Sequence, residues 1–219
     1  ELEAWGALFD RTRDGKILQR NFGGHRYPRL AHVGDRTGLE LIRTLQDHGI
    51  HQGIKFYMEN TVVSLVKDGQ RVVGAFGYDP ERGRFKLWRA GAVVLATGGI
   101  GRAYKVTSNS WEYTGDGQAL AYEAGAELMD MEFIQFHPTG MMWPPSVQGI
   151  LVTEGVRGEG GILLNKDGER FMERYAPTMK DLASRDVVSR AMATEIKDGR
   201  GAGPYNDYIL LKLDHLGPE

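Results

Sequence analysis

Apolar residues recur every three or four positions in three stretches of the chain, residues 35–49, 115–125 and 184–199. This spacing is typical of amphipathic helices. Each stretch begins near a residue suited to capping a helix and ends on a glycine. We therefore expect three helices, terminated by Gly49, Gly125 and Gly199, the last of them over 184–197.

Short β-rich runs, separated by turn signals, follow the first of these helices. They are rich in valine and aromatic residues, and Glu59-Asn60 and Asp68-Gly69 lie between them. Close spacing of this kind favours antiparallel neighbours. We expect a small antiparallel meander built from residues 55–58, 61–66, 71–78 and 84–89.

A different pattern begins at Ala92–Ala96, where five apolar residues follow one another. A continuous apolar run predicts a strand buried on both faces, as in a parallel sheet. Further strands are expected at residues 131–136, 161–165 and 208–213. Strands and helices alternate up to residue 136, and a loop-rich part with one long helix follows. We expect an α/β domain over 1–136 and part of an α+β domain over 137–219.

Composition excludes several classes of protein. Net charge is −2, so no basic footprint indicates nucleic-acid binding. Cysteine is absent, which excludes disulfides and thiolate chemistry, and no metal site is expected. No apolar run approaches the ~20 residues of a membrane helix, and Glu1 begins no signal peptide. The abrupt ends of the chain lead us to expect a piece of a longer protein.

Glycine is unusually frequent, with 30 residues in 219, about twice the ordinary frequency. The glycines gather in short groups, such as Gly23-Gly24 and Gly98-Gly99-Ile100-Gly101. Such groups mark tight turns or places where the backbone closely approaches a ligand. One group directly follows the apolar run, where an α/β sheet presents its strand ends to a cofactor. Another flanks Asp116, which is either a helix cap or a ligand contact.

Five further residues, in three places along the chain, carry candidate chemistry. His137 directly follows an expected strand, although a lone histidine is more often structural. Thr153, Glu154 and Arg157 lie among four glycines, which is costly in chain entropy unless geometry demands it. Arg185 stands at the start of the long helix, where the dipole disfavours a cation by ~0.3–1 kcal/mol. Such a local conflict is typical of a functional residue.

Taken in order, these motifs resemble the flavoprotein subunit of succinate dehydrogenase and fumarate reductase. The resemblance covers essentially the whole chain. It is carried by the segments Ala96–Gly99, Thr114–Gly117, Gln135–Gly140, Thr153–Gly161, Gly168–Pro177 and Lys180–Arg190.

The resemblance implies that residues up to about 136 belong to an FAD-binding domain and the remainder to a mobile capping domain. The family interconverts succinate and fumarate by hydride transfer with FAD. By analogy, Arg185 is the proton donor or acceptor, supplied through Glu154 and Arg157. His137 and Thr153 bind a substrate carboxylate. The residues expected against FAD are Ala96, Thr97, Gly98 and Asp116.

The same resemblance implies two kinds of partner, membrane-anchor subunits and an iron–sulfur subunit, with electrons passing on to quinone. It places the parent protein in the cytoplasm, peripheral on the inner face of the cell membrane. The chain departs from the family pattern in lacking the dinucleotide fingerprint, the histidine that links FAD covalently, and the second substrate histidine and arginine. Val156 replaces a frequent cysteine. The fragment alone is therefore expected to be inactive.

Three alternatives stay open at this point. An L-aspartate oxidase has the same fold with an amino-acid substrate. A catalytically incompetent fragment would act only as a structural or assembly piece. A generic flavoprotein without dicarboxylate chemistry would leave the combination of Thr153, Glu154 and Arg185 unexplained.

Overall fold

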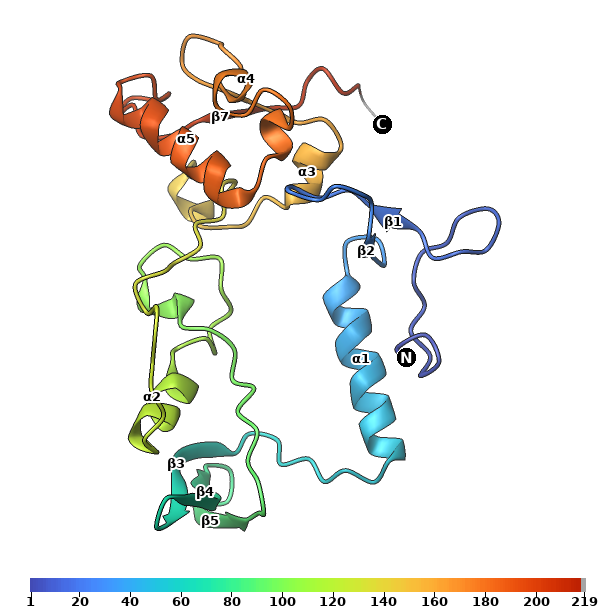
Figure 1. Ribbon diagram of the computed structural model, residues 1–219, viewed down its shortest axis with the longest axis vertical. Helices are drawn as coiled ribbons and strands as arrows, with labels where there is room; N and C mark the ends of the chain where they lie inside the picture. Colours follow the sequence, from blue (N-terminus) through green and yellow to red (C-terminus); the bar gives the residue numbers. More distant parts are fainter. Residues whose placement is uncertain (218–219) are drawn as a thin grey trace. The chain divides into compact units, whose positions relative to one another are not determined.

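The computed structural model describes residues 1–217, so the last two residues of the expected 137–219 domain lie outside the described residues. The chain folds into two compact units. One combines residues 1–54 with the chain from residue 135 onward, and the other comprises residues 55–134 (Figure 1). This division, which groups residues by their contacts, does not coincide with the expected functional domains 1–136 and 137–219. Those functional domains stay a prediction.

Among the described residues, the first unit contains two small sheets and four α-helices. Each sheet is a single antiparallel strand pair, β1 with β2 and β6 with β7. The elements are β1 (Gln19–Arg20), β2 (Leu30–Ala31), α1 (Thr37–His51), α3 (Glu154–Gly158), β6 (Ile162–Leu164), α4 (Met172–Tyr175), α5 (Arg185–Lys197) and β7 (Leu210–Lys212). Short 3-10 turns are η2 (Pro145–Val147) and η3 (Lys180–Leu182).

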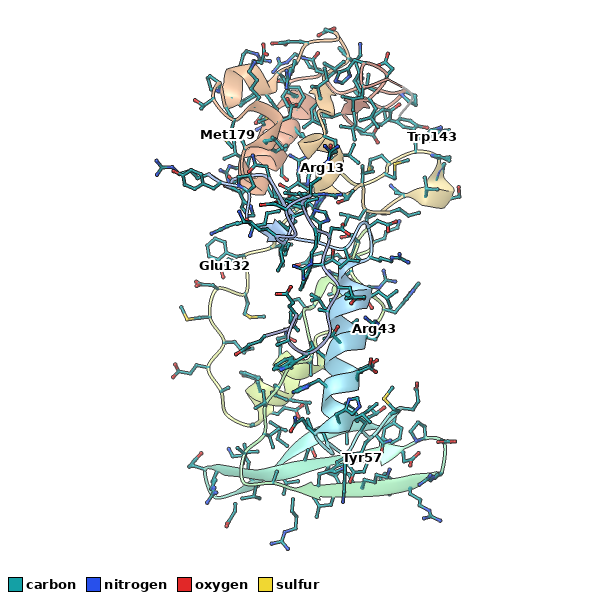
Figure 2. The ribbon with its side chains drawn as sticks, turned by 90° about the vertical axis from the view of Figure 1, so that its right-hand side faces the viewer. Arg13, Arg43, Tyr57, Glu132, Trp143 and Met179 are labelled. Atoms are coloured by element: carbon teal, nitrogen blue, oxygen red, sulfur yellow. The ribbon has the colours of Figure 1, made fainter. Side chains whose placement is uncertain are left out.

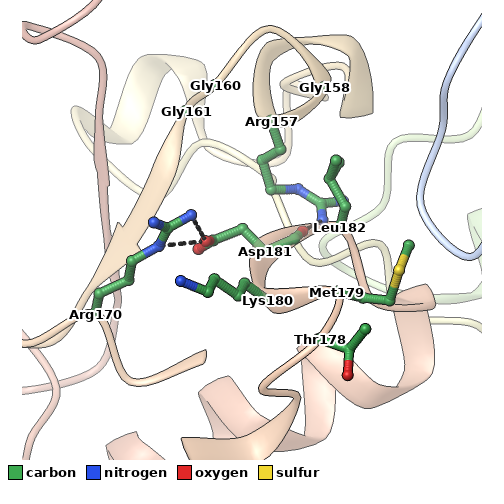
Figure 3. A pocket seen from close by; sticks show the side chains of 10 residues that line it. All are labelled: Arg157, Gly158, Gly160, Gly161, Arg170, Thr178, Met179, Lys180, Asp181 and Leu182. Atoms are coloured by element: carbon green, nitrogen blue, oxygen red, sulfur yellow. Dashed lines mark hydrogen bonds and ion pairs between the residues drawn. The ribbon is translucent and has the colours of Figure 1, made fainter. Parts of the chain in front are cut away.

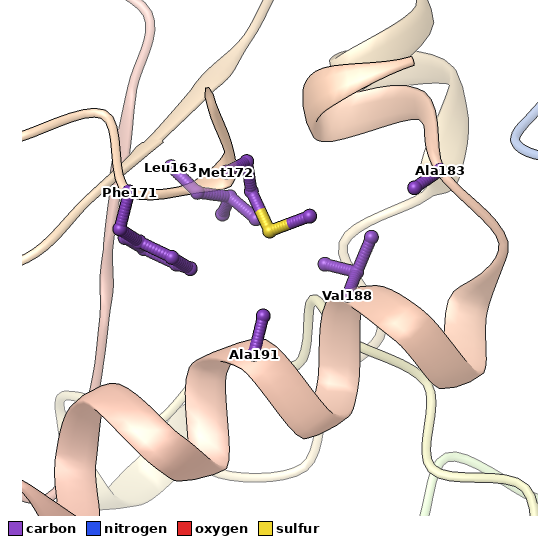
Figure 4. Packing of buried hydrophobic residues seen from close by; sticks show 6 residues of the cluster. All are labelled: Leu163, Phe171, Met172, Ala183, Val188 and Ala191. Atoms are coloured by element: carbon purple, nitrogen blue, oxygen red, sulfur yellow. The ribbon is translucent and has the colours of Figure 1, made fainter. Parts of the chain in front are cut away.

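The hydrophobic core of this unit lies between β6, α4 and α5. Val188 and Ala191 lie three residues apart on α5 and turn the same buried face inward. Figure 4 shows them facing Phe171 and Met172, both of which are fully buried. The helix predicted over 184–197 is thus confirmed one residue shorter, and the strands predicted near 161–165 and 208–213 are confirmed with shorter bounds.

Helix α1 confirms the first expected helix but differs in its end and its packing. The helix runs through Gly49 to His51, and Gly53 adopts a left-handed φ of 72° just beyond it. Gly53, rather than Gly49, therefore terminates the helix. Leu39 and Ile42, on the expected apolar face, are 64% and 57% exposed, because nothing among residues 1–217 covers them.

The second unit contains the predicted meander. Strands β3 (Thr61–Asp68), β4 (Arg71–Asp79) and β5 (Arg84–Arg89) pair antiparallel in that order. Gly74 and Gly77 on β4 face neighbouring backbone so closely that an added Cβ would lie 2.1 Å from a carbonyl oxygen. Helix α2 (Asp116–Glu123) packs near β3, and the turn η1 (Gly101–Ala103) precedes it. The expected helix near 115–125 is confirmed.

Three expected strands are absent from the described residues: 55–58, 92–96 and 131–136 are extended or turned but unpaired. The prediction of a strand buried on both faces at 92–96 is therefore wrong here, and Val94 is 88% exposed. A buried strand needs neighbours on each side, and no other described strand runs alongside these segments. Figure 2 labels Glu132 in the last of these segments, in which Phe133 and Phe136 are exposed. All sheets within residues 1–217 are antiparallel.

Within residues 1–217, no helix combines the length and the apolar character needed to cross a membrane.

Candidate active site

The site begins at the first residue of α5. Ser184 occupies the N-cap position, but its hydroxyl donates to Asp186 and leaves the helix without a side-chain cap. Arg185 follows and donates from Nε to Glu154 Oε2 at 2.7 Å. This ion pair offsets the unfavourable position of a cation at a helix N-terminus. The expected conflict at Arg185 is thus resolved by a partner 31 residues away in sequence.

Glu154 is the first residue of the short helix α3. Thr153 precedes it as the N-cap, and the Thr153 hydroxyl accepts a hydrogen bond from the Gly155 amide at 3.3 Å. Glu154 itself is buried, with only 3% of it exposed. Its second oxygen, Oε1, accepts the Gly23 amide at 2.6 Å. The buried carboxylate therefore has a donor on each oxygen.

Arg157 lies one turn further along α3, behind Glu154. It is 1% exposed, and its Nη2 lies 3.9 Å from Glu154 Oε1. Its Nη1 donates to the Asp181 carbonyl, while Nε and Nη2 have no hydrogen-bond partner among the described residues. Burial lowers the pKa of Arg157, and the nearby charges of Glu154 and Asp181 oppose that shift.

A pocket of about 190 Å³ lies beside Arg157. Figure 3 shows Arg157 next to the segment 180–182, with Arg170 paired to the Asp181 carboxylate. Arg170 Nη2 lies 2.6 Å from Asp181 Oδ2, and Asp181 Oδ1 accepts the Leu163 amide at 2.8 Å. Asp181 thus anchors the turn η3 on β6 and supports Arg157 through its carbonyl.

His137 and Thr153 stand at the two ends of one hairpin. The Thr139 hydroxyl donates to the Val152 carbonyl at 2.8 Å, and the Val152 amide donates to the Thr139 carbonyl at 2.9 Å. Ser189 on α5 donates to the Phe136 carbonyl at 2.7 Å and fixes the start of the hairpin. These bonds bring the hairpin ends close to α3 and α5.

The surroundings of His137 favour its neutral form. Its Nδ1 accepts the Thr139 amide at 3.2 Å, which leaves Nε2 as the donor of a neutral ring. Partial burial lowers the pKa of His137 first, followed by the positive charges of Arg185 and Arg157. Glu154 opposes this shift. The imidazole is therefore held neutral near pH 7, with one N–H available to a ligand.

The four residues expected against FAD all lie in the second unit. Thr97 packs so closely on Gly117 that an added Cβ would meet its hydroxyl at 1.7 Å. Gln118 donates to the Gly98 carbonyl at 3.2 Å. These contacts bring Thr97 and Gly98 to the start of α2, where Asp116 is the first helical residue and Gly115 is the N-cap. The simpler interpretation of Asp116 as the cap is wrong.

The remaining features of this segment fit a polar cofactor. Gln118 Oε1 is buried and has no hydrogen-bond partner among the described residues. Ala96, Thr97 and Gly98 are exposed. Gly98 has a left-handed φ of 74°, and a Cβ there would lie 2.6 Å from the Tyr113 ring, so both the backbone conformation and the packing on Tyr113 require glycine. The segment therefore offers an exposed backbone and one acceptor without a partner among the described residues to a bound ligand.

Sequence reasoning missed three contributors to the site. Gly23 holds the Glu154 carboxylate, Asp181 supports Arg157, and Ser189 anchors the hairpin. The pair Gly23-Gly24 stood out among the glycine groups, and Asp181 and Ser189 lie in the segment Lys180–Arg190 that carries the resemblance, but none of the three was assigned a role. Within residues 1–217, no group of three or more His, Cys, Asp or Glu residues could hold a metal ion.

Known proteins resemble the chain along its entire length. The FAD binding domain family matches residues 1–219. The mitochondrial succinate dehydrogenase flavoprotein subunit of Oryza sativa subsp. japonica is 48% identical over 228 residues, covering 100% of this chain. A polypeptide of the CoM/CoB fumarate reductase of Methanothermobacter marburgensis is 49% identical over 219 residues, again covering 100% of this chain.

A solved structure has the same fold. The chain superimposes on the E. coli quinol fumarate reductase with a TM-score of 0.91 and 38% identity, over 99% of its length. The chain spans 36% of the Oryza relative, 40% of the Methanothermobacter relative and 38% of the E. coli chain.

Proposed function

The chain belongs to the FAD binding domain family, and we propose that it carries part of the catalytic site of a flavoprotein that interconverts succinate and fumarate. One observation carries the proposal: the buried Glu154 carboxylate lies between Arg185, at 2.7 Å, and the buried Arg157, at 3.9 Å. Two arginines joined by one buried carboxylate form a path along which a proton can move.

FAD supplies the two-electron chemistry when bound, by exchanging a hydride with a substrate carbon. Ala96, Thr97, Gly98 and Asp116 are the residues that would hold it, supported by the fit of that segment to a polar ligand. The neutral Nε2–H of His137 and the hydroxyl hydrogen of Thr153 would bind one substrate carboxylate. Both donors are available, since His137 Nδ1 and the Thr153 oxygen accept backbone amides.

Arg185 would exchange the proton at the neighbouring carbon. In fumarate reduction its guanidinium donates a proton to that carbon and is reprotonated from Glu154, which is supplied in turn by Arg157. In succinate oxidation the proton moves in the opposite direction, from Arg185 through Glu154 to Arg157. Arginine is a costly acid–base group because its pKa exceeds ~12. Burial lowers the pKa of Arg157, in the direction that eases this transfer.

The wider architecture follows from the same proposal. Residues 1–136 would belong to an α/β FAD-binding domain and residues 137–219 to an α+β capping domain that closes over the dicarboxylate. His137, Thr153 and Arg185 lie in one compact unit, and the residues expected against FAD lie in the other. We also propose that the parent flavoprotein assembles with membrane-anchor subunits and an iron–sulfur subunit. It would then be cytoplasmic and peripheral on the inner face of the membrane.

The function is tested in the full-length FAD-loaded protein with an artificial electron acceptor. Arg185→Lys keeps a positive charge but changes its geometry and its place in the proton path. We expect succinate oxidation to be nearly abolished while flavin absorbance stays unchanged. L-aspartate, offered to the unchanged protein, is expected to give no turnover.

Arg190→Lys is the matched control, because Arg190 lies on the same helix, is exposed and pairs only with Asp186 among the described residues. Its turnover should equal that of the unchanged protein. Near-normal activity in Arg185→Lys would rule out the acid–base role. Turnover of aspartate in place of succinate would replace the proposal with the amino-acid oxidase alternative.

A further inference from the structure

The loop that contains Gly23 lies directly against the proposed proton path. The Gly23 amide donates to Glu154 Oε1 at 2.6 Å, and the next amide, of Gly24, donates to the Leu182 carbonyl at 3.0 Å. Two successive backbone amides thus attach this loop to α3 and to the turn that precedes α5. The attachment crosses 131 residues of sequence between Gly23 and Glu154.

Glycine is required at position 23 because neighbouring atoms leave no room for a side chain, and not because of its backbone conformation. Its φ lies outside the left-handed region, in contrast to Gly24 at 76°. A Cβ on Gly23 would lie 2.0 Å from Glu154 Oε1, 3.2 Å from Glu154 Cδ and 3.0 Å from the Ala183 carbonyl oxygen. The Ala183 oxygen belongs to the backbone just before the N-cap of α5 and is held in place by the fold. A Cβ on Gly23 would therefore displace the Glu154 side chain.

We propose that Gly23 is a positioning residue for the proton path. Its amide holds Oε1 of Glu154, so that Oε2 faces Arg185 Nε at 2.7 Å. Its missing side chain leaves the space that this carboxylate occupies. The inference rests on the proposed function, because it assigns to Gly23 a role through Glu154 and not a contact with substrate.

Gly23→Ala in the full-length FAD-loaded protein tests this role. Displacing a catalytic group by about 1 Å costs on the order of 100-fold in rate. We expect kcat for succinate oxidation to fall by about that factor, with KM and flavin content within twofold of the unchanged protein. The solvent deuterium isotope effect on kcat should rise, because proton transfer becomes slower.

Gly158→Ala is the matched control, because Gly158 faces the same loop that contains Gly23. The nearest atom to its added Cβ is the Asn21 carbonyl oxygen at 3.5 Å, an ordinary contact. We expect its kcat and isotope effect to be unchanged. A Gly23→Ala protein with normal kcat, or with equal losses of kcat and flavin, would overturn the positioning role.

A second measurement does not depend on turnover. Hydrogen–deuterium exchange of the peptide containing residues 21–24 should be slow in the unchanged protein and faster in Glu154→Ala, which removes the acceptor. Unchanged exchange would contradict the contact, even if Gly23→Ala failed to fold. Absence of succinate turnover in the unchanged protein would count against the proposed function alone, since this exchange measurement would still show whether Gly23 holds Glu154.

Discussion

At position 154 a carboxylate is buried almost completely, and the reason is local to that residue. A buried charge is costly unless it is paired and hydrogen-bonded. Glu154 meets both conditions, since Arg185 binds one oxygen and the Gly23 amide binds the other. Arg157, by contrast, keeps two N–H groups without partners among the described residues.

The charges around His137 permit a prediction at this scale. Arg185 lowers the pKa of His137, and Glu154 raises it. We therefore expect the titration midpoint of His137 to lie below its ordinary value of 6.5. It should rise in Arg185→Gln and fall further in Glu154→Gln. NMR titration of 15N-histidine-labelled protein measures all three midpoints.

Arg190→Gln is the control variant, because Arg190 is an exposed cation on the same helix that pairs with Asp186. It should leave the midpoint of His137 unchanged. Shifts of His137 in the same direction in both variants would show that burial alone, and not the ion pair, controls the ring.

At the scale of one element, α5 has a different task at each end. Its first residue, Arg185, belongs to the site, while Glu195 near its last turn is fully buried. Glu195 accepts hydrogen bonds from Arg200, Arg174, Tyr175 and Asn165 at 2.8–3.0 Å. These donors come from segments before and after the helix. Glu195 therefore fixes α5 in the fold and thereby fixes Arg185.

Glu195→Gln should destabilise the first unit by about 1.5–3 kcal/mol, the usual range for hydrogen bonds to a charged group. The donors, above all Arg200, hold the pKa of Glu195 far below its ordinary value of 4.5. A lowered carboxylate pKa adds stability above the unfolded-state pKa, and this stability is lost as the pH falls. Urea unfolding should show that the unchanged protein loses stability below about pH 4.5 more steeply than the variant.

Asp198→Asn is the control for that measurement. Asp198 also pairs with Arg200, at 2.8 Å, but its side chain is 45% exposed. An exposed ion pair contributes about 0–1 kcal/mol. Equal losses in the two variants would mean that burial of Glu195 adds nothing to the network.

At the scale of the whole molecule, the chain leaves much apolar surface uncovered within residues 1–217. Leu39, Val94 and Phe133 are 64%, 88% and 75% exposed. Such surface is normally covered in a folded protein, and large exposed patches bind other apolar groups. The chain also spans only 36–40% of the relatives' length. Both observations indicate that this segment needs further protein around it.

The 219-residue chain produced alone should therefore bind FAD at far below one equivalent and should bind the apolar dye ANS strongly. The full-length protein should bind FAD stoichiometrically and ANS weakly. Flavin absorbance and dye fluorescence measure the two properties. Stoichiometric FAD in the isolated chain would show that the 219 residues hold the cofactor unaided.

The sequence predicted those features that depend on neighbours along the chain. The helices α1, α2 and α5 and the meander β3–β5 were expected because apolar spacing and turn residues act over a few positions. Their ends were less certain, as α1 shows by continuing through Gly49. The strand expected at 92–96 failed because burial on both faces depends on strands elsewhere in sequence.

The sequence by itself determined which residue types stand at the site and in what order, from His137 through Thr153 and Glu154 to Arg185. Only the tertiary structure decided how they meet. It joined Arg185 to Glu154 across 31 residues, placed Gly23 against the same carboxylate across 131, and buried Arg157 behind it. Local sequence patterns predict helices and strands, because these depend on residues a few positions apart. The pairing of buried charges depends instead on which distant segments pack together, and a short-range pattern in the sequence does not predict that packing.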